Sequence, residues 1–485
     1  MSTAEMAGTL NGVGGVAANA RNRASAAANA KTQPAVKAKA EELIAEIFMD
    51  KRENFIAVTP QALIDRLSQP QMWGAGEAAK VRRLFMYMSN WRQQSYGAKL
   101  LELGRAYEPF SPDSDLLVTR KYSEPEKSSL ELQLMDGMRD LMKHANYTRI
   151  DPDSIELIMT KDSHYGLDLR VDLDAFDEIE IFYRGAITRK DSRRSRAKFY
   201  LKMEDFDVPI FQRLAIVFKL KPDAKRVEEL MAQEGLDRDK AERRVKQMRG
   251  AIAGLVSPDY VYVKLFKNIP RSDIEMVFPN TKIKFRLFDK IKLGVTASGG
   301  LGMGVAATVT KIAVATNPIA LAGAVAGFGG VAIRQLVNFS NQRNKYMVTM
   351  AQNLYSHALA DNRGAMTLLA ERASEEDIKE EVLLYSLLVK ERVKEHELKD
   401  ADKAIERYLT ATFGLDVNFD VQEALDRLKH DGLVSVAADG TLVALAPAAA
   451  AARIDVLWDS YLDQLVSFAA GEGQEYEGEA PVTLT

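Results

Sequence analysis

The chain contains no cysteine among its 485 residues. Disulfide bonds, thiolate metal sites and cysteine nucleophiles are therefore excluded. Its five histidines are scattered, and none has a partner at the spacing of a zinc motif. The sequence also lacks a P-loop and the G-x-S-x-G turn of serine hydrolases. These absences remove the commonest catalytic and cofactor-binding patterns, and we expect no cofactor.

An excess of charge of one sign is also absent. The net charge of −3 gives no overall nucleic-acid footprint, and 47% hydrophobic with 27% charged residues is a globular composition. The length predicts about three domains. Residues 1–40 lack the apolar core of a secretory signal and are rich in Ala, Asn, Gly and Ser. We expect a disordered tail there, with an organellar transit peptide as the alternative.

Two folded regions with different periodicity follow the tail. Residues 41–150 have helical spacing of apolar residues, with Thr59-Pro60 as a helix start and Pro109 as a stop. Residues 151–292 contain alternating segments such as GLDLRVDLD, EIEIFYRGAI, LAIVFKL and DYVYVKLF, which predict strands. A charged segment with helical spacing, residues 223–250, interrupts these strands. The fold class expected for this region is α+β with an antiparallel sheet.

Residues 293–335 are nearly free of charge. Two apolar stretches, 293–310 and 312–333, are each near the length that crosses a hydrocarbon core of about 30 Å. Asn317-Pro318 predicts a turn between them. Small residues at a spacing of four, which let helices approach closely in lipid, are Gly300, Gly304, Gly323 and Gly327. We expect a transmembrane helical hairpin packed through these glycines; the alternative is an Ala/Gly-rich hairpin buried inside the protein.

Residues 336–470 are predicted to be helical again. Three helical segments precede VSVAADGTLVALAP, a hairpin around Asp439-Gly440, and together they form a winged-helix-like pattern. The segment in the recognition-helix position mixes acidic residues with Arg427, Lys429 and His430, and the flanking SEEDIKEE is acidic. Phosphate-lined grooves favour basic helices, so we expect a protein contact at this end and no specific nucleic acid. Residues 471–485 are predicted to be an acidic disordered tail.

Clustered charges supply the remaining candidate sites. A basic run in the α+β region is expected to contact anionic lipid or an acidic partner, with an exposed loop as the alternative. Its members are Arg184, Arg189, Lys190, Arg193, Arg194, Arg196 and Lys198. Asp172 and Asp174 are weak candidates for a divalent-cation site, and the alternative is the solvated face of a strand. No catalytic residue is predicted.

Several segments in the same order resemble a known family. They include FIAVTPQALIDRL, YEPFSPDSD and DEIEIFYRGA, and the two most specific are LFKNIPRSDIEMVFPNTKIKFRLFDKIKLG and LADNRGAMTLLAERASEEDIKEEVLLYSLL. On these segments the chain resembles the transmembrane protein 143-like family of bacteria, mitochondria and plastids, whose function is unknown. The resemblance covers most of residues 53–445. It implies membrane spans and supplies no catalytic residues.

These observations predict a membrane-anchored interaction or scaffold protein without catalytic activity, its domains facing the cytoplasm or matrix. Expected partners are membrane lipids and a protein bound at the winged-helix-like end. The expected location is the bacterial cytoplasmic membrane, or alternatively the mitochondrial inner membrane. One alternative function is a membrane-surface enzyme acting on lipid headgroups with a divalent metal. The other is a soluble nucleic-acid-binding regulator.

Overall fold

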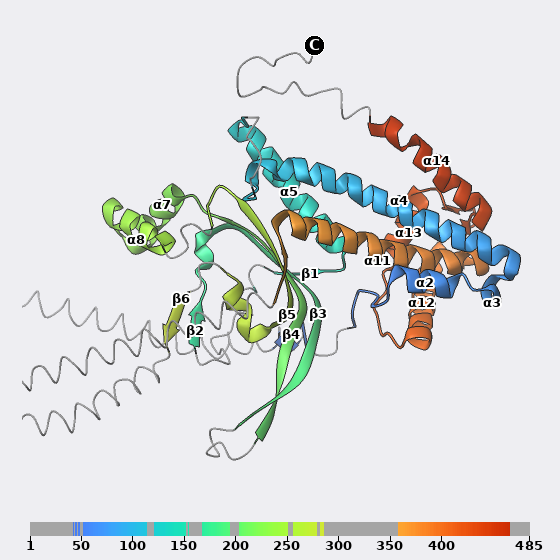
Figure 1. The fold of residues 1–485 in the computed structure, drawn as a ribbon, viewed down its shortest axis with the longest axis horizontal. Coiled ribbons are helices and arrows are strands. Elements are labelled where there is room, and N and C mark those ends of the chain that lie inside the picture. The colour runs from blue at the N-terminus through green and yellow to red at the C-terminus, as the bar shows by residue number, and fades with distance from the viewer. Residues whose placement is uncertain are drawn as a thin grey trace, which may run out of the picture.

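The computed structural model describes residues 52–113, 121–151, 167–194, 203–250, 256–278, 282–285 and 357–465, with single positions at 42, 44, 45, 47, 48 and 154. Its centre is an antiparallel sheet with long helices along one face, and a cluster of helices lies at one end (Figure 1). The N-terminal tail, the 293–335 segment and the acidic tail predicted from the sequence all lie outside the described residues.

The first helices begin and end where their sequence signals predict. The side chain of Thr59 accepts a hydrogen bond from the backbone N–H of Ala62 at 3.3 Å, and proline occupies the first helical position. The long helix that follows ends at Tyr107, before Pro109, as predicted. The helices are α2 (Pro60–Leu67), α3 (Pro70–Trp73), α4 (Ala75–Tyr107) and α5 (Glu124–His144), with a 3₁₀ turn at Glu108–Phe110.

The expected antiparallel sheet is confirmed. Its five strands lie in the order β1-β3-β4-β5-β7, and every neighbouring pair is antiparallel. They are β1 (Thr148–Ile150), β3 (Phe176–Arg194), β4 (Met203–Leu220), β5 (Val261–Pro270) and β7 (Ala358–Asp361). The long β3–β4 hairpin projects beyond the rest of the sheet (Figure 1). A separate antiparallel pair joins β2 (Leu167–Arg170) to β6 (Lys282–Phe285).

Short helices lie between or beside the strands in the sequence. The predicted charged segment is a helix pair, α7 (Asp223–Glu234) and α8 (Arg238–Gly250), which packs through Val227, Leu230, Ala241 and Val245. Two 3₁₀ helices, η2 (Leu173–Ala175) and η4 (Arg271–Val277), adjoin β3 and β5. The helix pair α7–α8 lies between β4 and β5 in the sequence, and these two strands still pair directly with each other.

The C-terminal region has the predicted order of three helices followed by a hairpin. Gly440, with φ of +78°, forms the tight turn of that hairpin. A short strand pairs with the hairpin, giving a three-stranded sheet in the order β8-β10-β9. The elements are α11 (Asn362–Lys390), β8 (Val393–Lys394), a 3₁₀ helix η5 (Glu395–Glu397), α12 (Leu398–Phe413), α13 (Val421–His430), β9 (Val434–Val436), β10 (Thr441–Ala444) and α14 (Pro447–Leu465).

Three larger hydrophobic cores connect regions that are far apart in the sequence. Helices α4, α5 and α11 cover one face of the sheet and share a core with Phe182, Val217 and Val263. Residues of η4 pack on the other face. A third core joins α2 and the first half of α4 to the winged-helix-like end. The hydrophobic packing therefore joins the predicted regions 41–150 and 336–470. The domain boundaries themselves stay predictions.

The transmembrane part of the predicted fold class requires correction. Among the helices that the structure describes, none is long and apolar enough to cross a membrane. The apolar stretches that motivated the hairpin, with their four glycines, lie outside the described residues. Length and low charge suggested a span, but the stretches are rich in alanine and glycine, whose low hydrophobicity also fits a buried hairpin. The transmembrane hairpin and the membrane character of the protein are therefore withdrawn.

Candidate functional site

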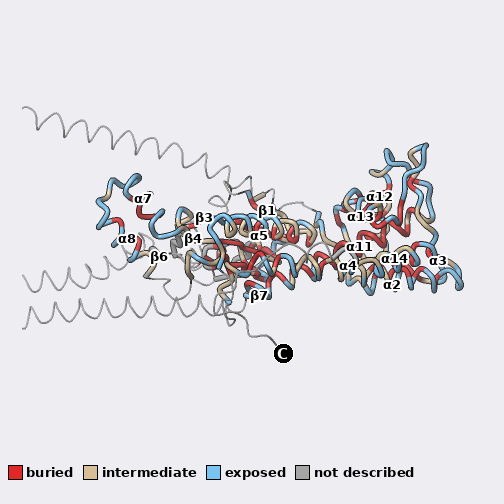
Figure 2. The backbone as a smooth tube through the Cα atoms, turned by 90° about the horizontal axis from the view of Figure 1, so that it is seen from above, coloured by how far each residue is buried: buried red, intermediate tan, exposed pale blue. Residues whose placement is uncertain are grey.

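A charged segment of α11 lies inside the protein. Within residues 374–381, SEEDIKEE, five ionisable side chains belong to residues that are at most 5% exposed: Glu376, Asp377, Lys379, Glu380 and Glu381. Figure 2 shows buried backbone along this helix. Charged side chains are almost never so buried unless they are paired. We call these five residues the α11 charge cluster, and its partners define the site.

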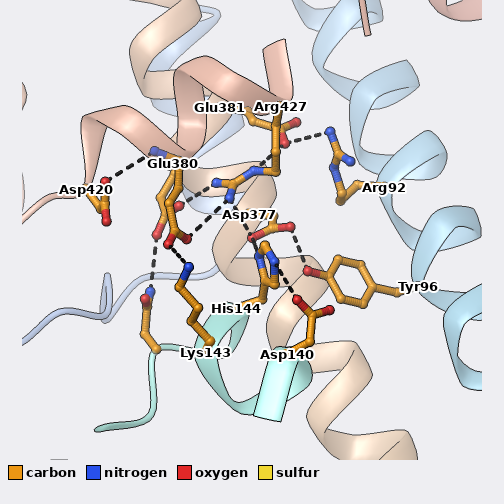
Figure 3. A network of polar contacts seen from close by, with 12 residues as sticks. Arg92, Tyr96, Asp140, Lys143, His144, Asp377, Glu380, Glu381, Asp420 and Arg427 are labelled. Carbon is orange, nitrogen blue, oxygen red and sulfur yellow. Dashed lines mark hydrogen bonds and ion pairs between the residues drawn. The ribbon is translucent and has the colours of Figure 1, made fainter. Parts of the chain in front are cut away.

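Arg427 of α13 is the main counter-ion of the cluster (Figure 3). Its Nε donates to Glu381 at 2.9 Å, its Nη2 donates to Glu380 at 2.5 Å, and its Nη1 lies 3.3 Å from Asp377. Burial would lower the pKa of Arg427, but these carboxylates raise it. The guanidinium therefore keeps its charge inside the protein and ties α13 to α11.

Helix α4 supplies a second arginine and a tyrosine. Nη2 of Arg92 lies 2.7 Å from Glu381 and 2.8 Å from Asp431, at the end of α13. The hydroxyl of Tyr96 donates to Asp377 at 2.7 Å. Burial of this phenol, with the carboxylate beside it, raises its pKa, so it stays a donor. The cluster thus joins α11 and α13 to α4, whose Tyr96 lies 281 residues before Asp377.

Helix α5 contributes a protonated histidine. His144 Nδ1 lies 3.1 Å from Asp377, and Nε2 lies 3.4 Å from Asp140. Burial would lower the pKa of His144, but hydrogen bonds with both carboxylates raise it to about 9. The imidazole is therefore a cation at neutral pH. Its neighbour Lys143 makes an ion pair with Glu423 of α13 at 2.7 Å, so α5 also joins α11 to α13.

The other end of the cluster anchors the segment before α2. A Glu376 carboxylate oxygen accepts from the backbone N–H of Ile56 at 3.1 Å, and Lys379 Nζ donates to the Ile56 carbonyl at 2.6 Å. Lys379 also bonds Glu376 at 2.8 Å. Arg184 of β3 lies 3.5 Å from the same carboxylate. The cluster therefore reaches the sheet as well as the helices.

The carboxylates of the cluster differ in their proton affinity. Burial raises the pKa of Glu380 to about 8 and raises that of Glu381. Burial also acts against ionised Asp377, but His144 and the arginines lower its pKa overall. Neighbouring carboxyls with pKa values shifted apart occur in acid–base sites. Catalysis also needs contact with a substrate, and these three side chains expose no more than 6% of their surface.

The geometry fits a network of ion pairs that holds helices together better than it fits an active site. Arg92, His144 and Arg427 each contact carboxylates of the network, although Nε of Arg92 and Nη1 of Arg427 have no hydrogen-bond partner among the described residues. In the part of the chain that the structure describes, no group of three or more histidine and acidic residues could hold a metal ion. The charges connect α11 to α4, α5, α13, β3 and the segment before α2. The relative positions of these segments therefore depend on the ion pairs.

Asp172 and Asp174, the weak metal candidates, have different surroundings. Both carboxylate oxygens of Asp172 lie 3.3 Å from Nη2 of Arg226, a buried arginine of α7. Asp174 is exposed in the following turn. Asp172 therefore connects the α7–α8 helix pair to the sheet region, and the cation site at Asp172 and Asp174 stays a prediction.

The predicted basic run is divided between two environments. The Arg184 guanidinium is largely buried, lies over the ring of Phe55 at 4.4 Å, and donates to the Ala145 carbonyl. Arg189 and Lys190 are exposed on the projecting hairpin. Arg193 and Arg194 end β3, whereas Arg196 and Lys198 lie outside the described residues.

An acidic residue of the next strand lies opposite this run. Lys190 of β3 is paired in register with Asp207 of β4, and both are exposed. Opposite charges at facing positions favour strand pairing. The hairpin is therefore a mixed-charge arm rather than a purely basic surface, and its contact with lipid or an acidic partner stays a prediction.

The α11 charge cluster is the feature that sequence reasoning missed. The acidic run was considered only for its effect on DNA binding. A signal was present: Leu383, Leu384 and Tyr385 follow as consecutive apolar residues of the same helix, and a helix that is apolar on all sides is buried. The run lies in that helix and is buried with it.

Comparison with known proteins adds a family of unknown function. Residues 211–364 match the model described as "Protein of unknown function (DUF3754)". The matched range begins within β4, includes β5 and β7, and ends in the first turn of α11. No solved structure matches the chain. Residues 211–364 are therefore similar to a family whose function is unknown.

Proposed function

We propose that this protein is a non-catalytic interaction or scaffold protein that binds another protein through its C-terminal unit, residues 391–465. The observation that carries this proposal is the inward orientation of Arg427. In DNA-reading proteins with this helix order, basic side chains of the recognition helix face the phosphates. Here Arg427 binds the α11 charge cluster, and Lys429 is paired with Glu395 at 2.7 Å.

The surface of the C-terminal unit supports a protein partner. Residues 391–465 contain fifteen acidic and eight basic residues, a balance that repels nucleic acid. Val436 and Val443 are exposed on the hairpin, and Trp458 and Leu462 are exposed on α14, at 41% to 68%. Exposed apolar residues among charges are common in protein interfaces. The partner we infer presents apolar side chains beside lysine or arginine.

The α11 charge cluster supports the scaffold role. It connects α13 of the C-terminal unit to α4, α5 and the segment before α2. A unit held in this way presents its exposed residues at a fixed position relative to the sheet. Fixed presentation reduces the entropy that binding must overcome.

We also propose kinship with the transmembrane protein 143-like family. The support is the set of segments described under Sequence analysis, of which the last forms β7 and most of α11. This kinship adds no activity to the proposal.

A site-specific cross-linking experiment tests the interaction role. A photoreactive residue is placed at Val443 or Trp458 in the full chain in its native cells, with exposed Glu228 of α7 as the matched control position. The proposal predicts the same protein cross-linked from the C-terminal positions and absent from the control. Cross-links indistinguishable from those of the control contradict it.

A nucleic-acid titration tests the alternative. The proposal predicts binding to random duplex no tighter than generic association, about 10⁻⁴ to 10⁻⁶ M at physiological salt. A tighter, sequence-selective complex that Lys429→Gln weakens would establish the nucleic-acid-binding alternative instead.

A further inference from the structure

Three cations form a row across the sheet. Arg184 of β3 is paired in register with Arg213 of β4, and Arg213 is paired with Lys267 of β5. Like charges at directly opposite positions destabilise a sheet. Glu376 lies near Arg184, but Arg213 makes no ion pair with a described residue and donates only to the Gln212 carbonyl, at 2.8 Å. Among the described residues, the positive charge at the centre of the row is therefore not balanced by a carboxylate.

The sheet reverses its faces at this level. In β4, Leu214 and Ile216 pack on the η4 side, and Phe211 packs on the same side. Regular alternation would place Phe211 and Leu214 on opposite faces. The adjacent strands have left-handed residues at the corresponding level, Gly185 with φ of +73° and Asn268 with φ of +51°. Such backbone conformations cluster at binding sites.

Glycine at position 185 is favoured by its left-handed backbone and by the closeness of Gln212. A Cβ atom at Gly185 would lie 2.3 Å from Oε1 of Gln212, in addition to the strain of its positive φ. The missing side chain leaves Gln212 room to lie over the strand. The irregular backbone thus positions an amide beside the two arginines.

A cavity of about 350 Å³ lies at this place, lined by Phe55, Arg184, Gln212, Arg213 and Asn268. That volume suits a small ligand. Guanidinium and amide groups dominate the lining, and they are the donors that recognise oxyanions. The nearby carboxylates are engaged elsewhere: Glu376 binds Ile56 and Lys379, and Glu53 accepts from the backbone N–H of Ala186 at 3.3 Å.

We propose that this cavity, the arginine pocket, binds a phosphate group, carried either by a small molecule or by a lipid headgroup. Arg213 is the principal ligand because no described carboxylate neutralises it. Arg184, held by the ring of Phe55, forms the inner wall. Lys267, exposed on the neighbouring strand, attracts the anion at the rim.

Calorimetric titration of the full chain with inorganic phosphate tests the pocket. Arg213→Gln should weaken phosphate binding about tenfold or more, because it removes a charge-assisted hydrogen-bond donor. Lys267→Gln should weaken it less. The matched control is Arg243→Gln, which removes an exposed arginine of α8 far from the row in sequence and should leave binding unchanged.

Phosphatidylcholine vesicles with and without phosphatidic acid distinguish the sources. Binding of inorganic phosphate alone supports a free phosphate compound, and binding only to vesicles with phosphatidic acid supports a headgroup. Thermal unfolding checks the fold of Arg213→Gln; if it is unfolded, Gln212→Ala and Lys267→Gln decide by the same titration. The proposal fails if neither probe binds the wild type, or if the pocket variants bind like Arg243→Gln. Either result leaves the protein-binding role of the C-terminal unit to its own test.

Discussion

Two charged stretches of the chain have opposite surroundings. Residues 374–381 of α11, SEEDIKEE, are largely buried, whereas residues 187–190 at the base of the projecting hairpin, ITRK, are exposed. The counter-charges of the first stretch come from Arg92, His144 and Arg427, distant in sequence. Those of the second come from the adjoining strand. Local composition therefore does not decide whether a charge run is solvated; the tertiary arrangement does.

The two environments have different energetic consequences. Exposed ion pairs contribute little, because water and salt screen them. A buried pair contributes little net stability relative to apolar residues, but removing one partner leaves an uncompensated charge. Single substitutions should therefore separate the two regions clearly.

The largest effect is expected at Arg427. Replacing it by alanine leaves the buried carboxylates of Asp377 and Glu381 without their main counter-ion, and Glu380 without its hydrogen-bond donor. The free energy of unfolding should fall by about 3–5 kcal/mol, measured by denaturant unfolding. The matched control is Lys190→Ala on the hairpin, which should change it by less than about 0.5 kcal/mol. Equal effects would remove the distinction between the two regions.

The next effect is a dependence of stability on pH. The folded pKa of His144, about 9, lies above its ordinary value of 6.5. Its stabilising contribution is therefore fully present below pH 6.5 and lost as the pH rises through 9. The raised pKa of Glu380, about 8, acts in the same direction, because the folded state retains a proton that the unfolded state releases above about 4.5.

Thermal unfolding at a series of pH values measures this dependence. The wild type should lose stability between pH 6.5 and 9, by at most about 3 kcal/mol from His144. His144→Gln should reduce the slope in that window, leaving the part that Glu380 contributes. A slope that is the same in both proteins would show that the histidine is not held protonated by Asp140 and Asp377.

The smallest effect is expected on the hairpin. Lys190 and Asp207 face each other in register, and both are exposed. A double-mutant cycle with alanine at both positions should give a coupling energy of about 0–1 kcal/mol, reduced by added salt. A larger coupling that salt does not reduce would indicate that the two side chains are buried rather than exposed to solvent.

Much of the fold was predictable from local signals. The cap at Thr59, the stop before Pro109 and the turn at Asp439-Gly440 each depend on residues a few positions apart. Alternation in EIEIFYRGAI and LAIVFKL likewise indicated strands β3 and β4. These features need no knowledge of distant contacts.

The candidate site was not predictable in this way. Arg427 was considered for a DNA surface because it lies in the recognition-helix position of the winged-helix-like pattern, but its partners are carboxylates of α11. Arg184 was grouped with a basic run, although it lies against Phe55 and Glu376. The transmembrane hairpin, predicted from low charge, length, a turn signal and glycine spacing, was wrong, because none of the described helices could cross a membrane.

The most direct test is the coupling between Arg427 and Glu381, whose Nε···O distance is 2.9 Å. Denaturant unfolding of the wild type, Arg427→Ala, Glu381→Ala and the double variant gives the interaction energy. An internal tie between α11 and α13 predicts a coupling of about 2 kcal/mol or more that persists at high salt, because the pair is buried. Additivity within about 0.5 kcal/mol would contradict that account.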